Sequence, residues 1–259
     1  MTMPDVHTDD ETLAEILARR TGELLMRLRG EQNFSDPKSL RAQGDRRAHE
    51  YLVAELSRWR AGDAVLSEEG EHRGSDRAGA KRVWIVDPLD GTREYGEPGR
   101  TDWAVHVALW QDGELAAGAV ALPAQGLVLT TREPSSSAVA PHEPMRIVTS
   151  RTRPPGFLAD LATSVDGVLV PMGSAGAKVA SIVLGEADAY VHAGGQYEWD
   201  SAAPVAVAVA AGLHASRIDG SPLVYNQLDP KLPDLLVCRA PLADQLLAAI
   251  AVATRPAAE

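Results

Sequence analysis

From residue 83 the chain reads Val-Trp-Ile-Val-Asp-Pro-Leu-Asp-Gly-Thr, ending at Thr92. Its apolar start predicts a strand, and this strand delivers two carboxylates, Asp87 and Asp90, separated by a bend that Pro88 fixes. The Leu89 carbonyl can point the same way as both side chains, so that three oxygen ligands converge. Hard oxygen ligands without His or Cys suit Mg²⁺, which leaves its other positions to water and to substrate phosphate oxygens. The stretch therefore predicts a magnesium site at the end of a strand.

The two residues that follow these carboxylates suit phosphate binding. The backbone N–H groups of Gly91 and Thr92 can open a helix, and the N-terminus of a helix accepts phosphate oxygens. The competing interpretation is a tight Asp-Pro turn with ordinary Asp caps, in which neither carboxylate binds an ion. The stretch alone leaves both interpretations open.

Two more acidic sites favour the magnesium site. Glu68 follows a predicted strand at 64–67, and Asp200 stands where a helix is predicted to begin. Each has a simpler explanation, since Glu68 can be a solvated loop acid and Asp200 a helix N-cap. Neither explanation accounts for three carboxylate clusters at strand ends or helix starts, as a two-metal phosphate site needs. Because side chains alternate along an extended segment, only one of the neighbours Glu68 and Glu69 can face the ions.

Together these motifs resemble a known superfamily. Asp-Pro-Leu-Asp-Gly-Thr at 87–92, Ser-Glu-Glu at 67–69 and Trp-Asp-x-Ala-Ala at 199–203 are similar to the lithium-sensitive, magnesium-dependent phosphomonoesterases, which include inositol monophosphatase and fructose-1,6-bisphosphatase. The surrounding sequence most resembles the actinobacterial CysQ branch of the 3′(2′),5′-bisphosphate nucleotidases, whose members are 3′-phosphoadenosine 5′-phosphate phosphatases. The resemblance covers nearly the whole chain. It implies an α/β fold of five layers, an α-β-α-β-α sandwich.

The resemblance also implies roles for single residues. It implies that two or three Mg²⁺ ions are held by Glu68, Asp87, the Leu89 carbonyl, Asp90 and Asp200. It assigns Thr92, Glu68 and an acid from the second helix to the water that attacks phosphorus in line, and Asp45 is our candidate for that acid. The family often shows Thr-x-x-Asp here, whereas this chain has Ala42 in place of the Thr. The alternative for Asp45 is a helix N-cap.

Substrate contacts follow from the same resemblance. The residues that it implies are Asp90, Gly91, Thr92, Gly173, Ser174, Ala175, Lys178, His192 and Asp200. The spacing to Lys178 is one residue longer than in other nucleotidases, and its alternative is a solvated helix lysine. A lone His such as His192 is often a structural group instead. We expect the other histidines, including His106 within a strand, to be structural.

Hydrophobic periodicity predicts helices and strands that fit this fold. The predicted helices cover 8–30, 45–60, 156–163, 174–184, 201–211 and 242–254. The predicted strands cover 64–67, 82–86, 103–110, 114–122, 126–131, 145–149, 167–170, 187–191, 213–217 and 234–238. Strand 103–110 is apolar on both faces, which predicts burial on both sides. A Ser- and Pro-rich stretch at 133–144 predicts a junction between two halves, 1–140 with most metal ligands and 141–259 completing the metal and substrate site.

Composition narrows the classes of partner. The 259 residues carry a formal net charge of −11, and this acidity disfavours binding to a nucleic acid polymer. The longest apolar run, 202–213, is too short to span a bilayer, and the acidic N-terminus lacks the pattern of a signal peptide. A single cysteine, Cys238, indicates a reducing compartment, so we expect a cytoplasmic protein. The family further suggests a homodimer.

The sequence is compatible with three functions. The first is hydrolysis of the 3′-phosphate of 3′-phosphoadenosine 5′-phosphate (PAP), a step linked to sulfate assimilation. The second keeps the metal site and changes the substrate to inositol or fructose phosphates. The third is an inactive module that binds phosphate for regulation, and the retention of every implied ligand together with Thr92 argues against it.

Overall fold

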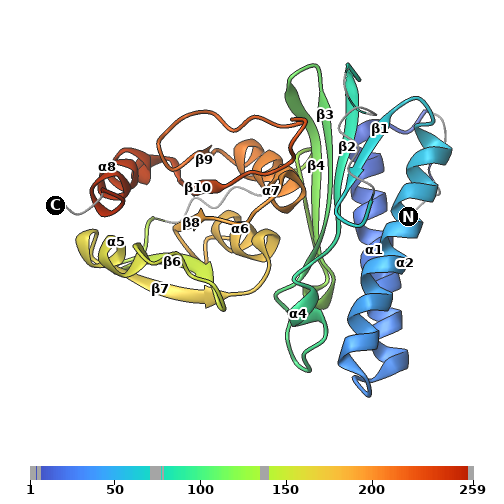
Figure 1. The fold of residues 1–259 in the computed structure, drawn as a ribbon, viewed down its shortest axis with the longest axis horizontal. Coiled ribbons are helices and arrows are strands. Elements are labelled where there is room, and N and C mark those ends of the chain that lie inside the picture. The colour runs from blue at the N-terminus through green and yellow to red at the C-terminus, as the bar shows by residue number, and fades with distance from the viewer. Residues whose placement is uncertain (1–3, 5–6, 71–76, 78, 135–139, 256–259) are drawn as a thin grey trace.

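The structure is a computed structural model that describes residues 4, 7–70, 77, 79–134 and 140–255. Its helices are α1 (Asp10–Gln32), α2 (Pro37–Trp59), α4 (Thr92–Tyr95), α5 (Leu158–Ser164), α6 (Ala175–Val183), α7 (Glu198–Ala210) and α8 (Ala243–Ala253). Its strands are β1 (Ala64–Ser67), β2 (Arg82–Asp90), β3 (Ala104–Gln111), β4 (Glu114–Leu122), β5 (Leu127–Thr130), β6 (Met145–Ser150), β7 (Gly167–Met172), β8 (Ala189–Ala193), β9 (Leu213–Ser216) and β10 (Asp234–Arg239). Helices and sheets alternate in five layers, which confirms the predicted sandwich (Figure 1).

The first sheet lies between two helical layers. Its strands follow the order β1-β2-β3-β4-β5, with β1 parallel to β2 and the remaining pairs antiparallel. Helices α1 and α2 cover one face through a leucine-rich core, and α7 covers the other (Figure 1). Most of β3 is buried as a result, as its apolar sequence predicts.

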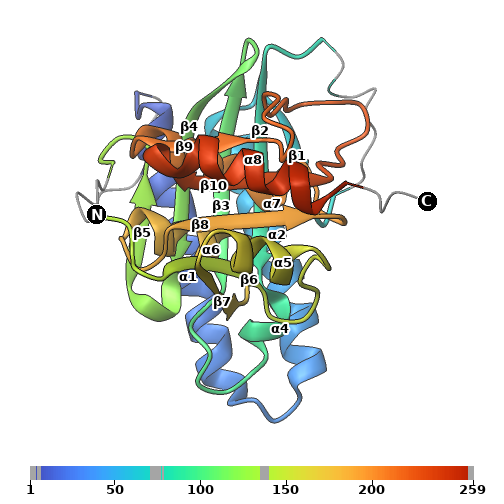
Figure 2. The same ribbon diagram turned by 90° about the vertical axis from the view of Figure 1, so that its left-hand side faces the viewer.

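The second sheet is built from the chain after residue 144. Its order is β7-β6-β8-β10-β9, in which β6 runs parallel to both of its neighbours. Helices α5 and α8 cover its outer face, as Figure 2 shows from that side. This sheet faces the first one across the central helices α6 and α7 (Figure 1).

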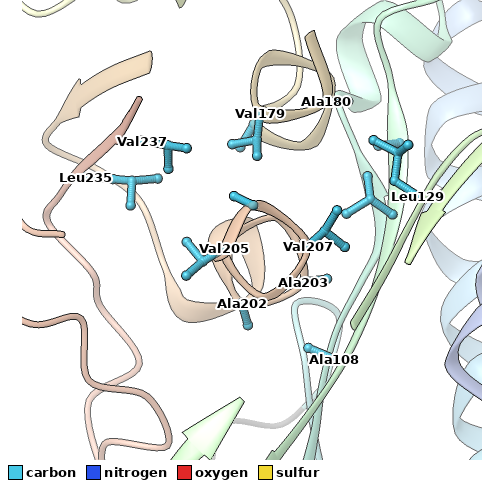
Figure 3. Close-up of a cluster of buried hydrophobic side chains, with 14 of the residues drawn as sticks. Ala108, Leu129, Val179, Ala180, Ala202, Ala203, Val205, Val207, Leu235 and Val237 are labelled. Carbon is cyan, nitrogen blue, oxygen red and sulfur yellow. The ribbon is translucent and has the colours of Figure 1, made fainter. Parts of the chain in front are cut away.

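Small side chains fill the central layer. Helix α7 is buried between the two sheets and is rich in alanine and valine, so it packs closely on both sides (Figure 3). Gly118 of β4 shows how close the contact is, since a Cβ there would lie 2.7 Å from the Cβ of Ala206. Helix α7 therefore reaches the first sheet, and its first turn comes to lie beside the end of β2.

The structure corrects the predicted start of the second helix, which matters for the site. Helix α2 begins at Pro37 rather than at Asp45, because Asp36 caps it and accepts hydrogen bonds from the backbone N–H groups of Lys38 and Ser39. The polar run that follows carries too few apolar residues to reveal the helix. Gly44 then lies inside α2, where a Cβ would come within 2.9 Å of Leu89 Cδ2. The absence of a side chain lets α2 approach the end of β2.

Two other sequence predictions concern the chain as a whole. Residues 135–139 of the predicted junction lie outside the described residues. No helix in the described part of the chain combines the length and the apolar character needed to cross a membrane.

Candidate active site

A cavity of about 270 Å³ opens between the end of β2, α4 and the start of α6. Both halves of the chain contribute to its wall. The residues proposed from the sequence that line it are Glu68, Asp87, Leu89, Asp90, Gly91, Thr92, Gly173, Ser174, Ala175, Lys178, His192 and Asp200. Asp45 is not among the lining residues, but it contacts Thr92, which is one of them. The structure thus gathers residues from widely separated parts of the sequence.

An irregularity in β2 brings its two carboxylates together. Residues three apart on a regular strand face opposite sides of the sheet. Asp87 pairs with His106, but the register then shifts, so that Asp90 pairs with Ala104 rather than Trp103. Ligand oxygens of Asp87, Asp90 and Asp200 consequently all lie within 4.8 Å of one another. The bend predicted at Pro88 is therefore a shift within one long strand.

Asp200 has two contacts of different kinds. It is the third residue of α7, and its Oδ2 accepts a hydrogen bond of 2.7 Å from the backbone N–H of Tyr197. The N-cap residue itself is Tyr197, so the N-cap interpretation of Asp200 is wrong in position. Its carboxylate nevertheless caps the helix end while belonging to the acidic cluster. The capping contact fixes the carboxylate in place beside Asp87 and Asp90.

Glu68 and Glu69 lie in a turn, so the alternation along an extended segment expected for them is wrong. Strand β1 ends at Ser67, and the backbone N–H of Gly70 donates to the Ser67 carbonyl at 2.9 Å. Of the two glutamates, Glu68 lines the cavity. The family resemblance, not alternation, selected Glu68 of the two, and its role as a metal ligand stays a prediction.

Glu68, Asp87, Asp90 and Asp200 form what we call the acidic wall, and their carboxyl groups shift one another's pKa values. Burial, followed by repulsion from Glu68, Asp90 and Asp200, holds the pKa of Asp87 well above its usual range. Burial and the charge of Asp200 raise the pKa of Glu68 to about 7. Asp200 itself has a pKa raised to about 6 by burial and by Asp90. Such a cluster of mutually repelling carboxylates favours a bound cation.

Asp90 differs from its neighbours because the protein compensates its charge. Burial opposes its ionisation, but His106, Lys178 and the Ser174 hydroxyl together outweigh that effect and lower the pKa of Asp90. His106 is fully buried, with Nε2 3.2 Å from Asp90 Oδ2 and Nδ1 3.1 Å from the Trp199 carbonyl oxygen. The sequence predicts a structural His106 within a strand and does not indicate its contact with Asp90. Pairing β2 with β3 in register would have revealed it.

Asp45 and Thr92 form the second predicted pair. Thr92 Oγ1 lies 3.1 Å from Asp45 Oδ1 and 3.0 Å from the Leu89 carbonyl oxygen, so its proton is shared between two acceptors. Asp45 is an interior residue of α2, and its N-cap interpretation is wrong. Burial raises the pKa of Asp45 to about 6, although the hydrogen bond from Thr92 opposes the shift.

The segment from Gly173 to Ala175 joins the second half to the acidic wall. Ser174 adopts a positive φ of 49°, and its hydroxyl donates to Asp90 Oδ2, which also accepts from the Gly176 backbone N–H at 2.7 Å. Gly173 leaves no room for a side chain, since a Cβ would lie 2.4 Å from Glu94 Cγ. This segment holds the start of α6 against Asp90.

Lys178 of α6 and His192 of β8 also line the cavity. Lys178 is buried, and its Nζ donates to the carbonyl oxygens of Gly173 at 3.2 Å and Ser174 at 2.6 Å. The alternative of a solvated helix lysine is therefore wrong. The Nε2 of His192 lies 2.6 Å from the Gly194 carbonyl oxygen.

The cavity has lining residues that the sequence analysis did not single out. Three of them are arginines: Arg93 of α4, and Arg151 and Arg153 of the loop after β6. Isolated arginines are common on protein surfaces, so the sequence did not indicate that these three would line the same cavity.

Comparisons with known proteins agree with this geometry. A profile of the inositol monophosphatase family matches residues 8–254. The 3′-phosphoadenosine 5′-phosphate phosphatase of Mycobacterium tuberculosis (strain CDC 1551 / Oshkosh) is 52% identical over 242 residues, covering 90% of each chain. The protein of the same name from Mycobacterium leprae (strain TN) is 51% identical over 253 residues, covering 93% of each. The crystal structure of CysQ from Bacteroides thetaiotaomicron superposes with a TM-score of 0.76 at 27% identity, covering 91% of this chain and 99% of that one.

Proposed function

Since the chain belongs to the inositol monophosphatase family, we propose that it is a magnesium-dependent phosphatase that converts PAP to AMP and phosphate. The observation that carries the proposal is the single cavity in which acidic residues from both halves meet Thr92. The proposed substrate comes from the mycobacterial relatives, which are about half identical over nine tenths of their length and are named 3′-phosphoadenosine 5′-phosphate phosphatases.

The acidic wall fits a divalent cation. Its donors are carboxylate and carbonyl oxygens, which suit Mg²⁺, and the raised pKa values of Asp87, Glu68 and Asp200 reflect burial and mutual repulsion that a bound cation would relieve. We propose that Glu68, Asp87, Asp90, Asp200 and the Leu89 carbonyl hold two or three Mg²⁺ ions. Bound there, the ions would lower the pKa of water and neutralise charge on the phosphoryl oxygens.

The protein's own groups then orient the reactants. Thr92 and Asp45 are placed to hold the attacking water, with Thr92 Oγ1 accepting its proton in a hydrogen bond and Asp45, whose pKa is about 6, fixing the orientation of that hydroxyl. We assign the substrate contacts to Asp90, Gly91, Thr92, Gly173, Ser174, Ala175, Lys178, His192 and Asp200. Lys178 adds a positive charge beside the place of the phosphate.

Inositol phosphates are alternative substrates because the family is named for inositol monophosphatase. Fructose 1,6-bisphosphate is a further alternative that rests on the resemblance of the sequence motifs alone. An inactive phosphate-binding module is the alternative from another class. The described residues contain all of the implied ligands together with Thr92, which argues against inactivity.

A phosphate-release assay separates these functions. The purified protein is given Mg²⁺ and either PAP, inositol 1-phosphate or fructose 1,6-bisphosphate, with the Asp87→Asn variant as the inactive control. We expect the highest kcat/KM with PAP. A higher value with either of the other substrates would overturn the substrate assignment, and no release from any of them would favour the binding module. Lithium should inhibit, and added Mg²⁺ should shift that inhibition.

The location, the metabolic link and the oligomeric state of the protein stay predictions. We propose a cytoplasmic location, a link to sulfate assimilation and a homodimer, all on the strength of the sequence and its family.

A further inference from the structure

The rim of the cavity carries positive charge that the proposed metal site does not use. Arg93 and Arg153 line the cavity and are exposed. Within the described part of the chain, neither guanidinium forms an ion pair with a carboxylate. A guanidinium in this state presents paired N–H donors that match two oxygens of a phosphate group.

Arg151 joins the two segments that carry these arginines. Its Nη2 lies 2.7 Å from Glu94 Oε1 and 2.9 Å from Glu97 Oε1, so its own charge is already compensated. This ion pair fastens the loop after β6 to α4. Arg153 is two residues beyond Arg151, and Arg93 immediately precedes Glu94. The two exposed arginines therefore come from the two segments that this ion pair joins, and both line the cavity.

The side of the cavity that Arg153 faces is also defined. Burial lowers the pKa of His192, and the positive charges of Lys178 and Arg153 lower it further. Arg153 therefore acts on His192 at the end of β8, and both residues line the cavity.

The chemistry of the substrate completes the argument. A bisphosphate carries two groups of about −1.5 to −2 charges each at neutral pH. The acidic wall can accept the reactive phosphate through cations, but it repels a second one. The second phosphate therefore needs a cationic site elsewhere in the cavity, and the arginine rim supplies it.

We propose that Arg93 and Arg153 bind the second phosphate, the 5′-phosphate of PAP, and so set the preference for a nucleoside bisphosphate over a monophosphate. This inference rests on the proposed function. The two arginines act as substrate-binding residues, one contributed by each half of the chain.

The test compares two substrates that differ only in this group: PAP and adenosine 3′-monophosphate. Steady-state kinetics are measured with saturating Mg²⁺ for the wild type, Arg93→Ala, Arg153→Ala and the double variant. Arg58→Ala is the matched control, since Arg58 is an exposed arginine of α2 outside the cavity lining and its loss changes net charge equally. Circular dichroism checks that each variant folds.

We expect each single substitution to lower kcat/KM for PAP by about 10- to 100-fold, mostly through KM, as expected for a lost charged hydrogen bond. The value for adenosine 3′-monophosphate should fall by no more than about threefold, consistent with screened charge effects. Arg93→Lys and Arg153→Lys should each keep part of the preference that the alanine variants lose.

Two other results would overturn the inference, and they are distinguishable. If the wild type hydrolyses PAP and the arginine variants keep its ratio of PAP to monophosphate activity, the proposed function stands and the arginine subsite is wrong. If the wild type does not hydrolyse PAP, the proposed function fails and the inference fails with it.

Discussion

Asp87, at the end of β2, and Asp188, just before β8, are both buried carboxylates, yet their surroundings shift the pKa in opposite directions. Burial opposes ionisation at Asp188 too, but hydrogen bonds from the Arg146 backbone N–H and from His142 lower its pKa overall. Arg239 Nε adds a further contact at 2.9 Å. Within the described residues, Asp87 has no such basic partner.

The difference separates two uses of a buried charge. The protein neutralises Asp188 with its own groups, so this carboxylate ties β6, β8 and β10 together and contributes to stability. It leaves Asp87 among other carboxylates, which is unfavourable without a ligand and favourable with a cation.

Neutralising Asp87 should abolish most of the activity and make the metal-free protein more stable. We expect Asp87→Asn to lower kcat by about 10³-fold or more, since a metal ligand and its charge are lost. In the presence of EDTA its midpoint of thermal unfolding should rise by roughly 2–4 °C, the shift that corresponds to about 1 kcal/mol in a protein of this size. Phosphate release and calorimetry measure the two effects. A variant that loses activity and is also less stable would contradict the idea of uncompensated repulsion.

The next effect separates two neighbouring glutamates. Glu68 lines the cavity, whereas Glu69 acts on it only as a nearby charge. Glu68→Gln should lower kcat by at least ~10²-fold, as expected for a positioned catalytic group, and Glu69→Gln by much less. Both are measured with saturating Mg²⁺. Equal losses would show that the position of Glu68 in the cavity does not matter.

Magnesium should stabilise the protein through the acidic wall alone. At 100 times its Kd, a ligand that binds only the folded state adds about 2.7 kcal/mol to the free energy of unfolding. We expect a gain of this order for the wild type and for Asp188→Asn, and little or none for Asp87→Asn. Urea unfolding with and without Mg²⁺ gives the numbers. An equal gain in all three proteins would place the ions elsewhere.

Neutralising Asp188 should do the reverse of neutralising Asp87. At pH 7 we expect Asp188→Asn to lower the free energy of unfolding by about 2 kcal/mol, because hydrogen bonds to a charged group are lost, and to leave kcat within about threefold. The folded-state pKa of Asp188 is lowered, so its contribution is complete above the ordinary Asp pKa of about 3.9 and is lost as the pH falls through the lowered value. The difference from wild type should therefore shrink below about pH 4.

Urea unfolding at pH 7, 5 and 3 measures this last effect. The control is Asp160→Asn, an exposed residue of α5 for which we expect no measurable change at any of these pH values. A difference that persists undiminished at pH 3 would mean that the Asp188 charge is not the source of the stabilisation.

Local sequence patterns predicted most of the fold. Alternation and apolar runs placed the strands of both sheets, because each strand has at least one buried face that its own residues must supply. The carboxylates at 87, 90 and 200 could be predicted for a similar reason, since each follows or begins an element visible in the sequence. The two-half division near residue 140 stays a prediction.

What the sequence did not reveal depends on contacts between distant segments. The position of Asp45 inside α2 follows from a cap at Asp36 and from the close approach that Gly44 allows. His106 reaches Asp90 only because β2 and β3 pair in one register. The compensation of Asp188 requires groups from β6 and β10, which no pattern within β8 indicates.

The shifted register between Asp87 and Asp90 has a consequence for how this chain can evolve. Because one carboxylate would turn to the far face of the sheet if the shift were removed, deletion or insertion of a single codon in this interval would separate the pair while leaving the strand intact. Substitutions elsewhere in β2 can accumulate one at a time, but the length of this interval cannot drift gradually. A lineage can therefore change the substrate through the arginine rim far more readily than it can change the spacing of these two acids.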